Sequence, residues 1–585
     1  MKTLCCLLLI VLSPSFSKAN NHRINHSLVK DTAAPFIIVQ PYDVVIDEIM
    51  ADPSPLVGLP NSEWIELRNI SSNEINLAGW KVGKPTGSSG PIRSFVLKPD
   101  SSVIICSSGS VNDLLVFGSV ISVTSFPSLS NTGDLIFLSN SLGKIIHAIN
   151  YSDNWYQNEL KKQGGWSLEM IDLNNPCTGI ENWSASDDAI GGTPGKINSI
   201  DAVNIDVVSP KLIRAYAPDS LHIILLFNEP LDSLYATNIN SYNISDGIGI
   251  PSSVVALAPL FDKIIIRLNN PLDRNKIYTV SVNQVKDCIG NEIGTYNTAR
   301  VGLYEPIDHF DIVINEILFN PKSSGVDYLE LFNRSNKIIN LKNVFIANLN
   351  ALGQTDNITS VSSNEVLFFP KEYIVLTENA NIVKRDFFTP YPERILQLTS
   401  LPSMNDDEGH VILLNEQGKQ IDSVSYKDDW HFKLLDNKEG IALERINCDG
   451  LSQDEHNWHS ASSSNNFGTP TYKNSQSNSQ SDFDGEINIE PKTISPDNDG
   501  HDDIATITYS FLEPGYVANI TVFDANGRAV KQLQRNALCG RTGYFRWDGL
   551  NEKSQRPPAG IYILYTEVFN LQGKIKKFKK AIVIK

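Results

Sequence analysis

The chain has 585 residues, of which 41% are hydrophobic and 20% charged, and its formal net charge is −17. A hydrophobic fraction of this size excludes a chain that is disordered throughout. The acidic balance argues against a nucleic-acid partner, because phosphate binding needs a basic face. At roughly 150 residues per domain, the length predicts about four domains.

The first residues have the pattern of an export signal. Lys2 precedes a short apolar run at 4–12, and small residues lead up to Ala19. This predicts a secretory signal peptide over 1–19 and a leader over 20–40. No later run reaches the roughly 18 apolar residues of a membrane helix, so we expect no transmembrane segment.

One stretch of the chain occurs twice. Residues 44–69 and 312–333 each hold an apolar strand with an acidic centre, followed by a second strand that ends in Glu-Leu-x-Asn. Apolar residues alternate with Glu in both, which is the period-2 pattern of half-buried strands. Later landmarks recur in the same order, up to Gly-Thr-Pro at 192–194 and 468–470. A duplicated domain explains this repetition.

These landmarks resemble those of the lamin-tail domain, an immunoglobulin-like (Ig-like) β-sandwich also found in secreted bacterial proteins. The resemblance rests on the Asn/Asp-Glu-Ile start and the closing Gly-Thr-Pro. It also rests on a Glu-x-x-Glu-Leu-x-Asn strand, where Asp327 replaces the first Glu in the second copy, and on an Asn-Leu-x-x-Trp turn, where Val344 replaces Trp80. It implies domains over 41–200 and 310–471, with display or adhesion as their role rather than a defined reaction.

Residues 204–304, between the copies, follow another pattern. A buried strand ends in Phe-Asn-Glu-Pro-Leu at 227–231, a strand with Tyr follows at 242–244, and Asp-Cys-Ile-Gly-Asn stands at 287–291. The segment resembles the bacterial surface-layer type of Ig-like domain. The resemblance implies a spacer at the cell surface.

The last domain is predicted over 486–585, after a linker at 472–485 whose Ser, Asn and Gln residues cannot bury a core. An Asp-rich loop opens it at 495–503, a hairpin turns at Asn-Gly in 526–527, and a Lys-rich strand closes it at 576–585. It resembles the C-terminal Ig-like domain shared by flagellar hook-capping proteins and by type IX secretion cargo of Bacteroidetes. The resemblance implies passage through the Gram-negative outer membrane, with the type IX machinery as partner, and frequent removal of this domain.

The carboxylates of the repeated strands are the strongest candidates for catalysis. They are Asp47, Glu48, Glu63, Glu66, Glu316, Asp327 and Glu330. Paired carboxylates perform acid and base chemistry when a cleft holds them at a catalytic distance. Glu63 and Glu66, however, are three residues apart on a strand, so they point to opposite faces. We therefore favour structural hydrogen bonding or a solvated face over contact with a cation or ligand, and catalysis comes last.

A second acidic set surrounds Gly500 in the last domain. It consists of Asp497, Asp499, Asp502 and Asp503. Oxygen ligands alternating around a glycine resemble half of an EF-hand calcium loop, but Thr508 stands where that loop has its Glu. The segment is therefore predicted as a tight turn, with calcium as the alternative, and we expect no other cofactor.

The remaining cysteine, tryptophan and histidine residues are given structural roles. Five cysteines follow the signal peptide: Cys106, Cys177, Cys288, Cys448 and Cys539. This odd number, spread along the chain, predicts buried thiols rather than a disulfide scaffold. Strand tryptophans such as Trp64, Trp80, Trp155 and Trp183 are predicted in cores, with sugar-stacking platforms as the alternative. His456 and His459 are predicted at the surface rather than as metal ligands.

Together these features predict an all-β chain of four tandem Ig-like β-sandwiches with little helix. We expect an exported Bacteroidetes protein of the cell surface or extracellular space. Its predicted work is noncatalytic display, adhesion, or binding of a matrix component or glycan. The alternative is a secreted metal-dependent hydrolase or the accessory module of an extracellular nuclease, because lamin-tail domains accompany nucleases in bacteria. A nuclease domain would need its own His/Asp/Asn metal motif and about a hundred further residues with helices, and the sequence shows no such motif.

Overall fold

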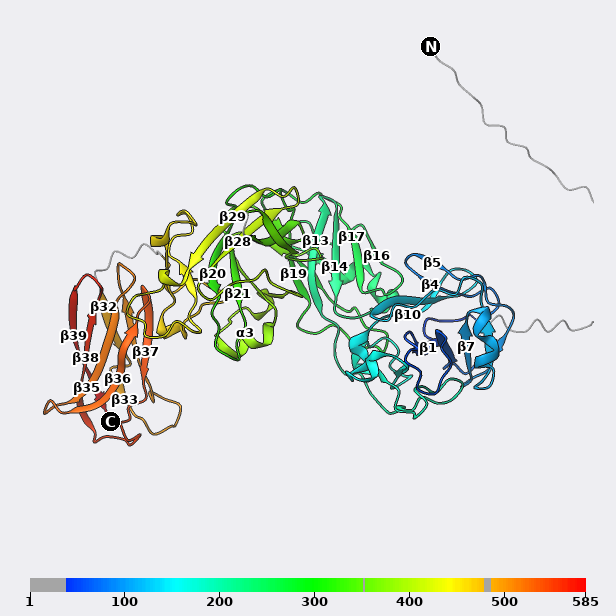
Figure 1. The fold of residues 1–585 in the computed structure, drawn as a ribbon, viewed down its shortest axis with the longest axis horizontal. Coiled ribbons are helices and arrows are strands. Elements are labelled where there is room, and N and C mark those ends of the chain that lie inside the picture. Colours follow the sequence, from blue (N-terminus) through cyan, green and yellow to red (C-terminus); the bar gives the residue numbers. More distant parts are fainter. Residues whose placement is uncertain (1–37, 351–352, 478–484) are drawn as a thin grey trace, which may run out of the picture. The chain divides into compact units, whose positions relative to one another are not determined.

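The computed structural model describes residues 38–350, 353–477 and 485–585, so the predicted signal peptide and most of the leader lie outside the described residues. The described chain is built of short strands in separate sheets (Figure 1), which confirms the all-β prediction. Its α-helices are α1 (Val111–Leu114), α2 (Ser233–Ala236) and α3 (Ala380–Asp386). Within these ranges no helix has the length and apolar character to cross a membrane.

Two compact units make up the structure. Among the described residues, the first holds 38–147, 152–169 and 185–200, and the second holds the remainder. Most of the first lamin-tail-like copy thus lies in the first unit, while its residues 148–151 and 170–184 belong to the second. The Ig-like segment, the second copy and the C-terminal domain lie in the second unit.

Strand β1 is central to the larger sheet of the first copy, in which β11, β1, β2, β7 and β8 follow one another in this order. These strands are β1 (Val44–Met50), β2 (Trp64–Asn69), β7 (Ser102–Cys106), β8 (Val120–Ser122) and β11 (Leu168–Met170). The antiparallel register places Glu48 opposite both Glu66 and Glu169, after a bulge between Ile46 and Glu48. A smaller sheet contains β4 (Lys81–Lys84), β5 (Gly87–Ser88) and β9 (Gly133–Ser139).

The second copy repeats this arrangement. Its larger sheet, in the order β27-β26-β21-β20-β30-β31, consists of β20 (Ile312–Leu318), β21 (Tyr328–Asn333), β26 (Tyr373–Thr377), β27 (Ile395–Gln397), β30 (Leu443–Arg445) and β31 (Trp458–Ser460). Glu316 lies opposite Glu330 and Glu444, again after a bulge, here between Ile314 and Glu316. The facing sheet contains β23 (Val344–Leu349), β24 (Thr355–Ser360), β28 (Glu408–Asn415) and β29 (Gln420–Lys427).

The first two strands of each copy are buried on both faces, so the expectation of half-buried strands is wrong. Every residue of β1, β2, β20 and β21 is buried. In the second copy, residues such as Ile314 and Leu331 face the apolar core, while Glu316 and Glu330 face Gly-Thr-Pro and the residue after it. That segment presents polar groups to the sheet, so the strand face that it covers carries glutamate although it is shielded from water.

The Ig-like segment and the C-terminal domain are each built from two sheets around an apolar core. Their strands pair antiparallel, except that β33 and β39 of the C-terminal domain pair parallel. The sheets of the former contain β13 (Leu212–Asp219), β14 (His222–Phe227), β16 (Ser253–Ala256) and β17 (Lys263–Arg267), and β15 (Tyr242–Ile244), β18 (Tyr278–Val282) and β19 (Thr298–Val301). Those of the latter contain β32 (Glu486–Glu490), β34 (Ala505–Ser510) and β37 (Thr542–Trp547), and β33 (Thr493–Ile494), β35 (Val517–Asp524), β36 (Ala529–Leu538), β38 (Gly560–Phe569) and β39 (Ile575–Ile584). The antiparallel pair β35 and β36 confirms the predicted Asn-Gly hairpin.

The stretch expected as a linker differs from that expectation in its first half. Asn474, Ser475 and Gln476 are buried. The Ser475 hydroxyl and the Gln476 backbone N–H both donate to Glu444, at 2.8 Å each. Because the partner of this polar run is a buried carboxylate rather than an apolar core, its composition does not distinguish it from a linker. Residues 478–484 lie outside the described residues.

Cysteine pairing corrects the prediction of buried thiols. Cys177 and Cys288 form a disulfide that joins positions 111 residues apart, with 6.2 Å between their Cα atoms. Cys106 and Cys539 are buried free thiols, as predicted, and Cys448 is free and half-buried. An odd number of cysteines argues against full pairing, but it leaves room for a single bridge that the fold brings together.

Candidate functional site

Three glutamates of the first copy lie on adjacent strands and bind the closing segment of the same domain. Glu48 accepts hydrogen bonds from the Ser167 hydroxyl at 2.6 Å and the Thr193 backbone N–H at 2.7 Å. Glu66 accepts the backbone N–H of Gly195 at 2.5 Å. Glu169 accepts the Thr193 hydroxyl at 2.9 Å. These carboxylates therefore fasten the Gly-Thr-Pro segment to the sheet.

The second copy uses its glutamates in the same way. Glu316 accepts the Thr469 backbone N–H at 2.9 Å and hydroxyl at 2.8 Å. Glu330 accepts the Thr471 backbone N–H at 2.6 Å. Glu444 also accepts the Thr469 hydroxyl, at 2.8 Å. One threonine thus bridges two buried carboxylates in each copy.

Each cluster contains one arginine. Arg68 pairs with Asp47 at 2.5 Å and with Glu66 at 3.0 Å. In the second copy Arg445 pairs with Asp422 at 3.1 Å. One guanidinium therefore stands among four carboxyl groups in each copy, so it could not balance all four if they were ionised.

The buried carboxyl groups hold their protons unusually tightly. Burial, reinforced by Asp47, raises the pKa of Glu66 to about 8. Burial, reinforced by Glu444, raises the pKa of Glu316 to about 8. Burial also raises the pKa of Asp47 to about 6, against the opposing effect of Arg68. Carboxyls of this kind could exchange protons near neutrality, but Glu48, Glu66, Glu316 and Glu330 have an exposed fraction of 0% and no contact with solvent.

Glu63 and Asp327 precede the second strand of each copy and lie apart from these clusters. Glu63 is half-buried and accepts the backbone N–H of Leu129 at 2.9 Å. Asp327 is half-buried as well, and burial raises its pKa to about 7. Glu63 thus binds a different segment from Glu66, and it stands before strand β2 rather than in it, where the prediction had placed it.

The Asp-rich loop brings together three of its four predicted ligands. Carboxylate oxygens within 4.8 Å of one another come from Asp497, Asp499 and Asp503. Asp502 does not belong to this group. Asp503 accepts the backbone N–H groups of Gly500 at 2.8 Å and Asn498 at 2.7 Å, and the Gly500 bond is the main cause of its lowered pKa. The loop is a hydrogen-bonded turn whose three carboxylates could hold a divalent cation.

A second acidic group, which the sequence analysis missed, lies in the Ig-like domain. Oxygens of Asp206, Glu229 and Asp287 lie within 4.8 Å of one another. Burial, with Asp206 and Asp287 nearby, raises the pKa of Glu229 to about 7. Asp287 is buried and accepts three backbone N–H groups, from residues 289–291, at 2.7 to 2.9 Å. The signal for this group was the Asp of the Asp-Cys-Ile-Gly-Asn motif, which we interpreted only as a family landmark.

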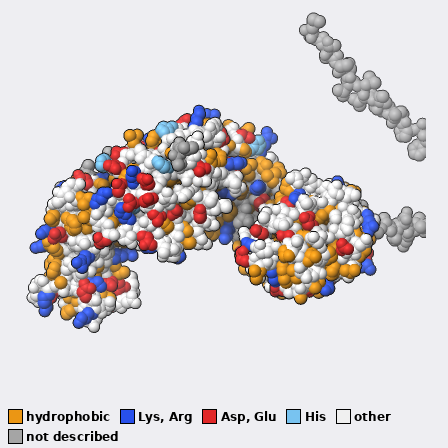
Figure 2. Space-filling view, in the orientation of Figure 1, with side chains coloured by type: hydrophobic (Ala, Val, Ile, Leu, Met, Phe, Trp, Pro, Cys, Tyr) orange, Lys and Arg blue, Asp and Glu red, His pale blue; other side chains and the backbone are white. Residues whose placement is uncertain are grey.

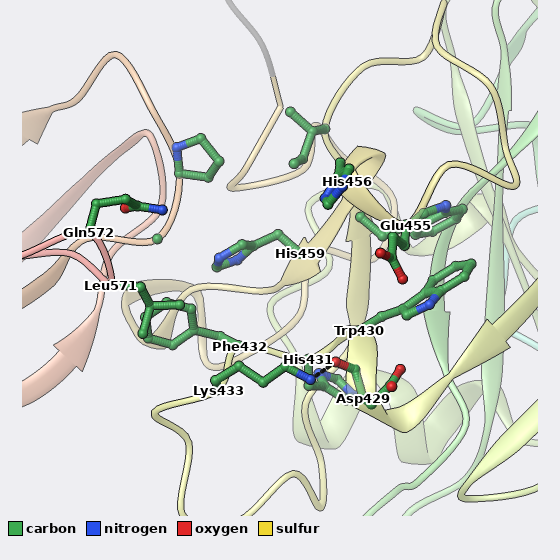
Figure 3. A pocket seen from close by; sticks show the side chains of 14 residues that line it. Asp429, Trp430, His431, Phe432, Lys433, Glu455, His456, His459, Leu571 and Gln572 are labelled. Atoms are coloured by element: carbon green, nitrogen blue, oxygen red, sulfur yellow. Dashed lines mark hydrogen bonds between the residues drawn. The ribbon is translucent and has the colours of Figure 1, made fainter.

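A cleft of about 550 Å³ lies between the second lamin-tail copy and the C-terminal domain. Figure 3 shows Leu571 and Gln572 on one side, His459 near the centre, and Trp430 and Glu455 on the other side. The volume falls within the range of roughly 300–1,000 Å³ that is typical of ligand sites. The cleft is therefore large enough for a small ligand or for one unit of a polymer.

Aromatic rings and histidines give this cleft its chemical character. The Trp430 and Trp458 rings are 6.4 Å apart, and the His459 and Phe432 rings 5.3 Å. Burial lowers the pKa of His459 and lowers that of His431 to about 3, so both imidazoles are neutral at pH 7. His431 bonds Ser460 through Nδ1 at 2.8 Å, while its Nε2 has no partner among the described residues. The cleft can stack on a flat ligand and form neutral hydrogen bonds with it.

The tryptophan and histidine predictions are largely confirmed. Trp64, Trp80 and Trp183 are buried, and Trp155 is half-buried. His456 is exposed as predicted. His459 is half-buried in the cleft, because the C-terminal domain contacts the copy at this point, with Gly515 beside its ring.

Charged side chains are mixed over the visible surface. Figure 2 shows Lys and Arg interspersed with Asp and Glu on the face in view. A mixed surface of this kind gives no basic footprint for nucleic acid on the face shown.

Comparison with known families supports the duplicated domain. The Lamin Tail Domain family model matches residues 40–153 and 308–428. The lamin-tail resemblance is therefore confirmed for these two segments. No curated protein matches the chain.

Solved structures with some likeness are bacterial. The N-terminal part of the bacterial S-layer protein SbsC is 20% identical, over 29% of this chain and 40% of that one, with a TM-score of 0.16. A DUF4876 family protein from Bacteroides thetaiotaomicron is 11% identical, over 31% and 77%, with a TM-score of 0.18. A Ca²⁺-stabilized adhesin of an Antarctic bacterium is 7% identical, over 94% and 100%, with a TM-score of 0.12. The chain spans about half or less of the S-layer structures that it matches. At these scores the likeness gives no support to any function.

Proposed function

We propose that this chain is an exported, noncatalytic protein of the cell surface or extracellular space that displays its domains for adhesion or for binding a matrix component or glycan. The observation that carries the noncatalytic part is the burial of the repeated carboxylates. Glu48, Glu66, Glu316 and Glu330 are fully buried and occupied by the chain's own N–H and O–H groups. A general acid or base must reach its substrate, and these groups do not.

The disulfide supports export. A bond such as Cys177–Cys288 persists in oxidising compartments and is rare in the cytosol. The resemblance of residues 486–585 to type IX cargo supports passage through the outer membrane with the type IX machinery as partner. Two matched lamin-tail segments support a role in display.

Ligand binding is proposed at two places in the second unit. The cleft beside Trp430 and His459 offers stacking and neutral hydrogen bonds, which suit a sugar unit. Calcium is proposed at Asp497, Asp499 and Asp503, which together offer carboxylate oxygens of the kind that this hard cation takes.

The location and mass of the native protein test this function. Cells, outer-membrane fraction and medium would be compared by mass spectrometry, before and after surface proteolysis. We expect a surface or released form that lacks residues 1–19 and 486–585. A periplasmic form that retains Lys585 would overturn the secretion route. Metal-dependent turnover of a nucleic acid or an ester that is lost in Glu66→Gln would overturn the noncatalytic assignment.

A further inference from the structure

A second cavity, of about 450 Å³, is lined by residues of the Ig-like domain and of the second lamin-tail copy. Its charged lining consists of Arg214, Arg300, Glu372, Glu393 and Arg394. Most charged side chains of a protein lie in water or beside a counter-ion. In this cavity one of the three arginines has no carboxylate partner among the described residues.

Arg214 is the arginine without a carboxylate partner. The pairing of β13 with β14 shifts between Leu212 and Arg214, so that one extra residue bulges there, and such bulges re-aim side chains. Arg214 is half-buried, and its buried Nε has no hydrogen-bond partner among the described residues. No ion pair joins its guanidinium to a carboxylate in that part of the chain. Burial lowers its pKa, opposed only by the phenol of Tyr216.

The other two arginines share a single carboxylate. Glu372 lies 2.6 Å from an Arg300 nitrogen and 2.9 Å from an Arg394 nitrogen. Glu393 lies 3.9 Å from Arg394, and its side chain is 68% exposed. Three guanidinium groups thus meet two carboxylates, one of them largely in water. The cavity is positive within a chain whose net charge is −17.

The side chain of Arg300 is also held in place at this cavity. The Arg300 guanidinium lies over the Phe369 ring, 4.2 Å from its centre, which fixes it in addition to the Glu372 bond. Apolar residues such as Leu396 and the hydroxyl-bearing Thr279 and Thr298 complete the walls. A ligand here would meet apolar surface, hydroxyls and one unpaired guanidinium at once.

We propose that this cavity binds the acidic group of a polysaccharide, either a uronate carboxylate or a sulfate ester, with Arg214 as its principal contact. A guanidinium presents parallel N–H donors that match either anion with two bonds. The apolar wall suits the face of a sugar ring, and the threonines suit its hydroxyls. The inference rests on the proposed binding of a matrix component or glycan, and it names the ligand class and the site.

Binding of the full-length chain to immobilised polymers tests this proposal. Dextran sulfate, polygalacturonate and neutral dextran serve as probes. We expect binding to at least one acidic polymer and not to dextran. Arg214→Ala should weaken it about tenfold or more, the usual loss for a charged hydrogen bond, and Arg214→Lys should weaken it less. Arg267→Ala, an exposed arginine of β17 in the same domain, is the matched control and should leave binding unchanged.

The outcomes separate the acidic groups and the two proposals. Binding to dextran sulfate alone identifies a sulfate ester, and binding to polygalacturonate alone identifies a carboxylate. Equal binding to neutral dextran, or equal losses in Arg214→Ala and Arg267→Ala, would overturn the proposal. If Arg214→Ala does not fold, phenylglyoxal labelling of the wild-type protein decides, because the bound polymer should slow the modification of Arg214. A surface-located chain that binds no acidic polymer overturns this site alone, whereas a cytoplasmic chain that binds one overturns the proposed function alone.

Discussion

The two lamin-tail copies bury the same set of ionisable groups, but their aspartate and arginine stand at different positions. Beside its three glutamates, the first copy pairs Asp47 with Arg68, and the second pairs Asp422 with Arg445. Both clusters therefore contain four carboxyl groups and one guanidinium. The glutamates stand at matching places in both copies, where they bind the closing segment. The arginine instead lies beside the buried aspartate, whose position differs between the copies.

A matching backbone N–H group has a different acceptor in each copy. The N–H of Ile46 donates to His147 Nδ1 at 2.8 Å, and the N–H of Ile314 donates to Asp422 Oδ2 at the same distance. Imidazole and carboxylate thus satisfy the same donor in the two copies. Only the carboxylate brings a charge, so only the second copy has an arginine at this position.

The cysteines of the two copies should separate them most strongly. Cys177 is bonded to Cys288, whereas Cys448 is free. Cys177→Ser opens a loop of 111 residues and should lower the free energy of unfolding by about 5 kcal/mol. Cys448→Ser should change it by less than about 1 kcal/mol, because the hydroxyl can replace the thiol next to Asn315. Urea denaturation measures both, and equal effects would contradict the assignment of the bridge.

Making the second copy resemble the first is the next largest change. Arg445→Met leaves Asp422 buried without its cation and should cost about 3 kcal/mol. Adding Asp422→His installs the neutral acceptor of the first copy and should recover most of that loss. Calorimetry of the single and double variants forms a double-mutant cycle. Additive losses would show that the two residues are not a unit.

The reciprocal change in the first copy should be smaller. Arg68→Phe places there the residue of the second copy and leaves Asp47 unpaired, at a cost of about 2 kcal/mol. The cost is lower because Arg68 is 7% exposed, so water can reach the vacated site. Asp47→Asn, the residue found at Asn315, should restore stability in the double variant. A double variant that is no more stable than Arg68→Phe would contradict the view that Arg68 serves to pair with Asp47.

Local sequence pattern was sufficient to predict the strands and the duplication. Alternation of apolar residues with Glu66 and Glu330 marked both second strands, which the structure has at Trp64–Asn69 and Tyr328–Asn333. Alternation could not say what covers the glutamate face, since carboxylates that meet water and carboxylates that meet backbone N–H groups give the same pattern. The covering residues Thr193 and Thr469 stand more than a hundred positions away from Glu48 and Glu316.

Features that join distant segments were beyond prediction for the same reason. Asp206 lies close to Asp287, and Cys177 is bonded to Cys288, although no local sequence pattern indicates either pair. The sites that depend on contact between domains, at His459 and at Arg214, need two surfaces that no single segment encodes. The sequence was therefore sufficient to predict the strands, whereas the sites depend on contacts between sheets and between domains, which the sequence pattern does not show.

The smallest expected difference between the copies is in their response to pH. Glu66 and Glu316 have folded-state pKa values of about 8, against 4.5 for an ordinary glutamate. Between these values the folded state keeps protons that the unfolded chain has lost, so the free energy of unfolding falls as pH rises from about 4.5 to 8. We expect a loss of about 1 kcal/mol per copy across this window, reduced from the full shift because neighbouring carboxyls share the protons.

The first copy should begin to lose stability at lower pH than the second. Asp47 has a folded-state pKa of about 6 against 3.8 for an ordinary aspartate, so it adds a group whose proton the unfolded chain loses from about pH 3.8 upwards. Calorimetric scans from pH 4 to pH 9 would resolve the two transitions. Glu66→Gln and Glu316→Gln should each flatten the response of their own copy, while Glu416→Gln, on an exposed turn, should alter neither. Stability that rises with pH in both copies would mean that the buried glutamates are ionised in the folded state. The single arginine of each cluster would then lie among four negative charges. Its removal should then cost more than the roughly 2 to 3 kcal/mol expected for one unpaired aspartate.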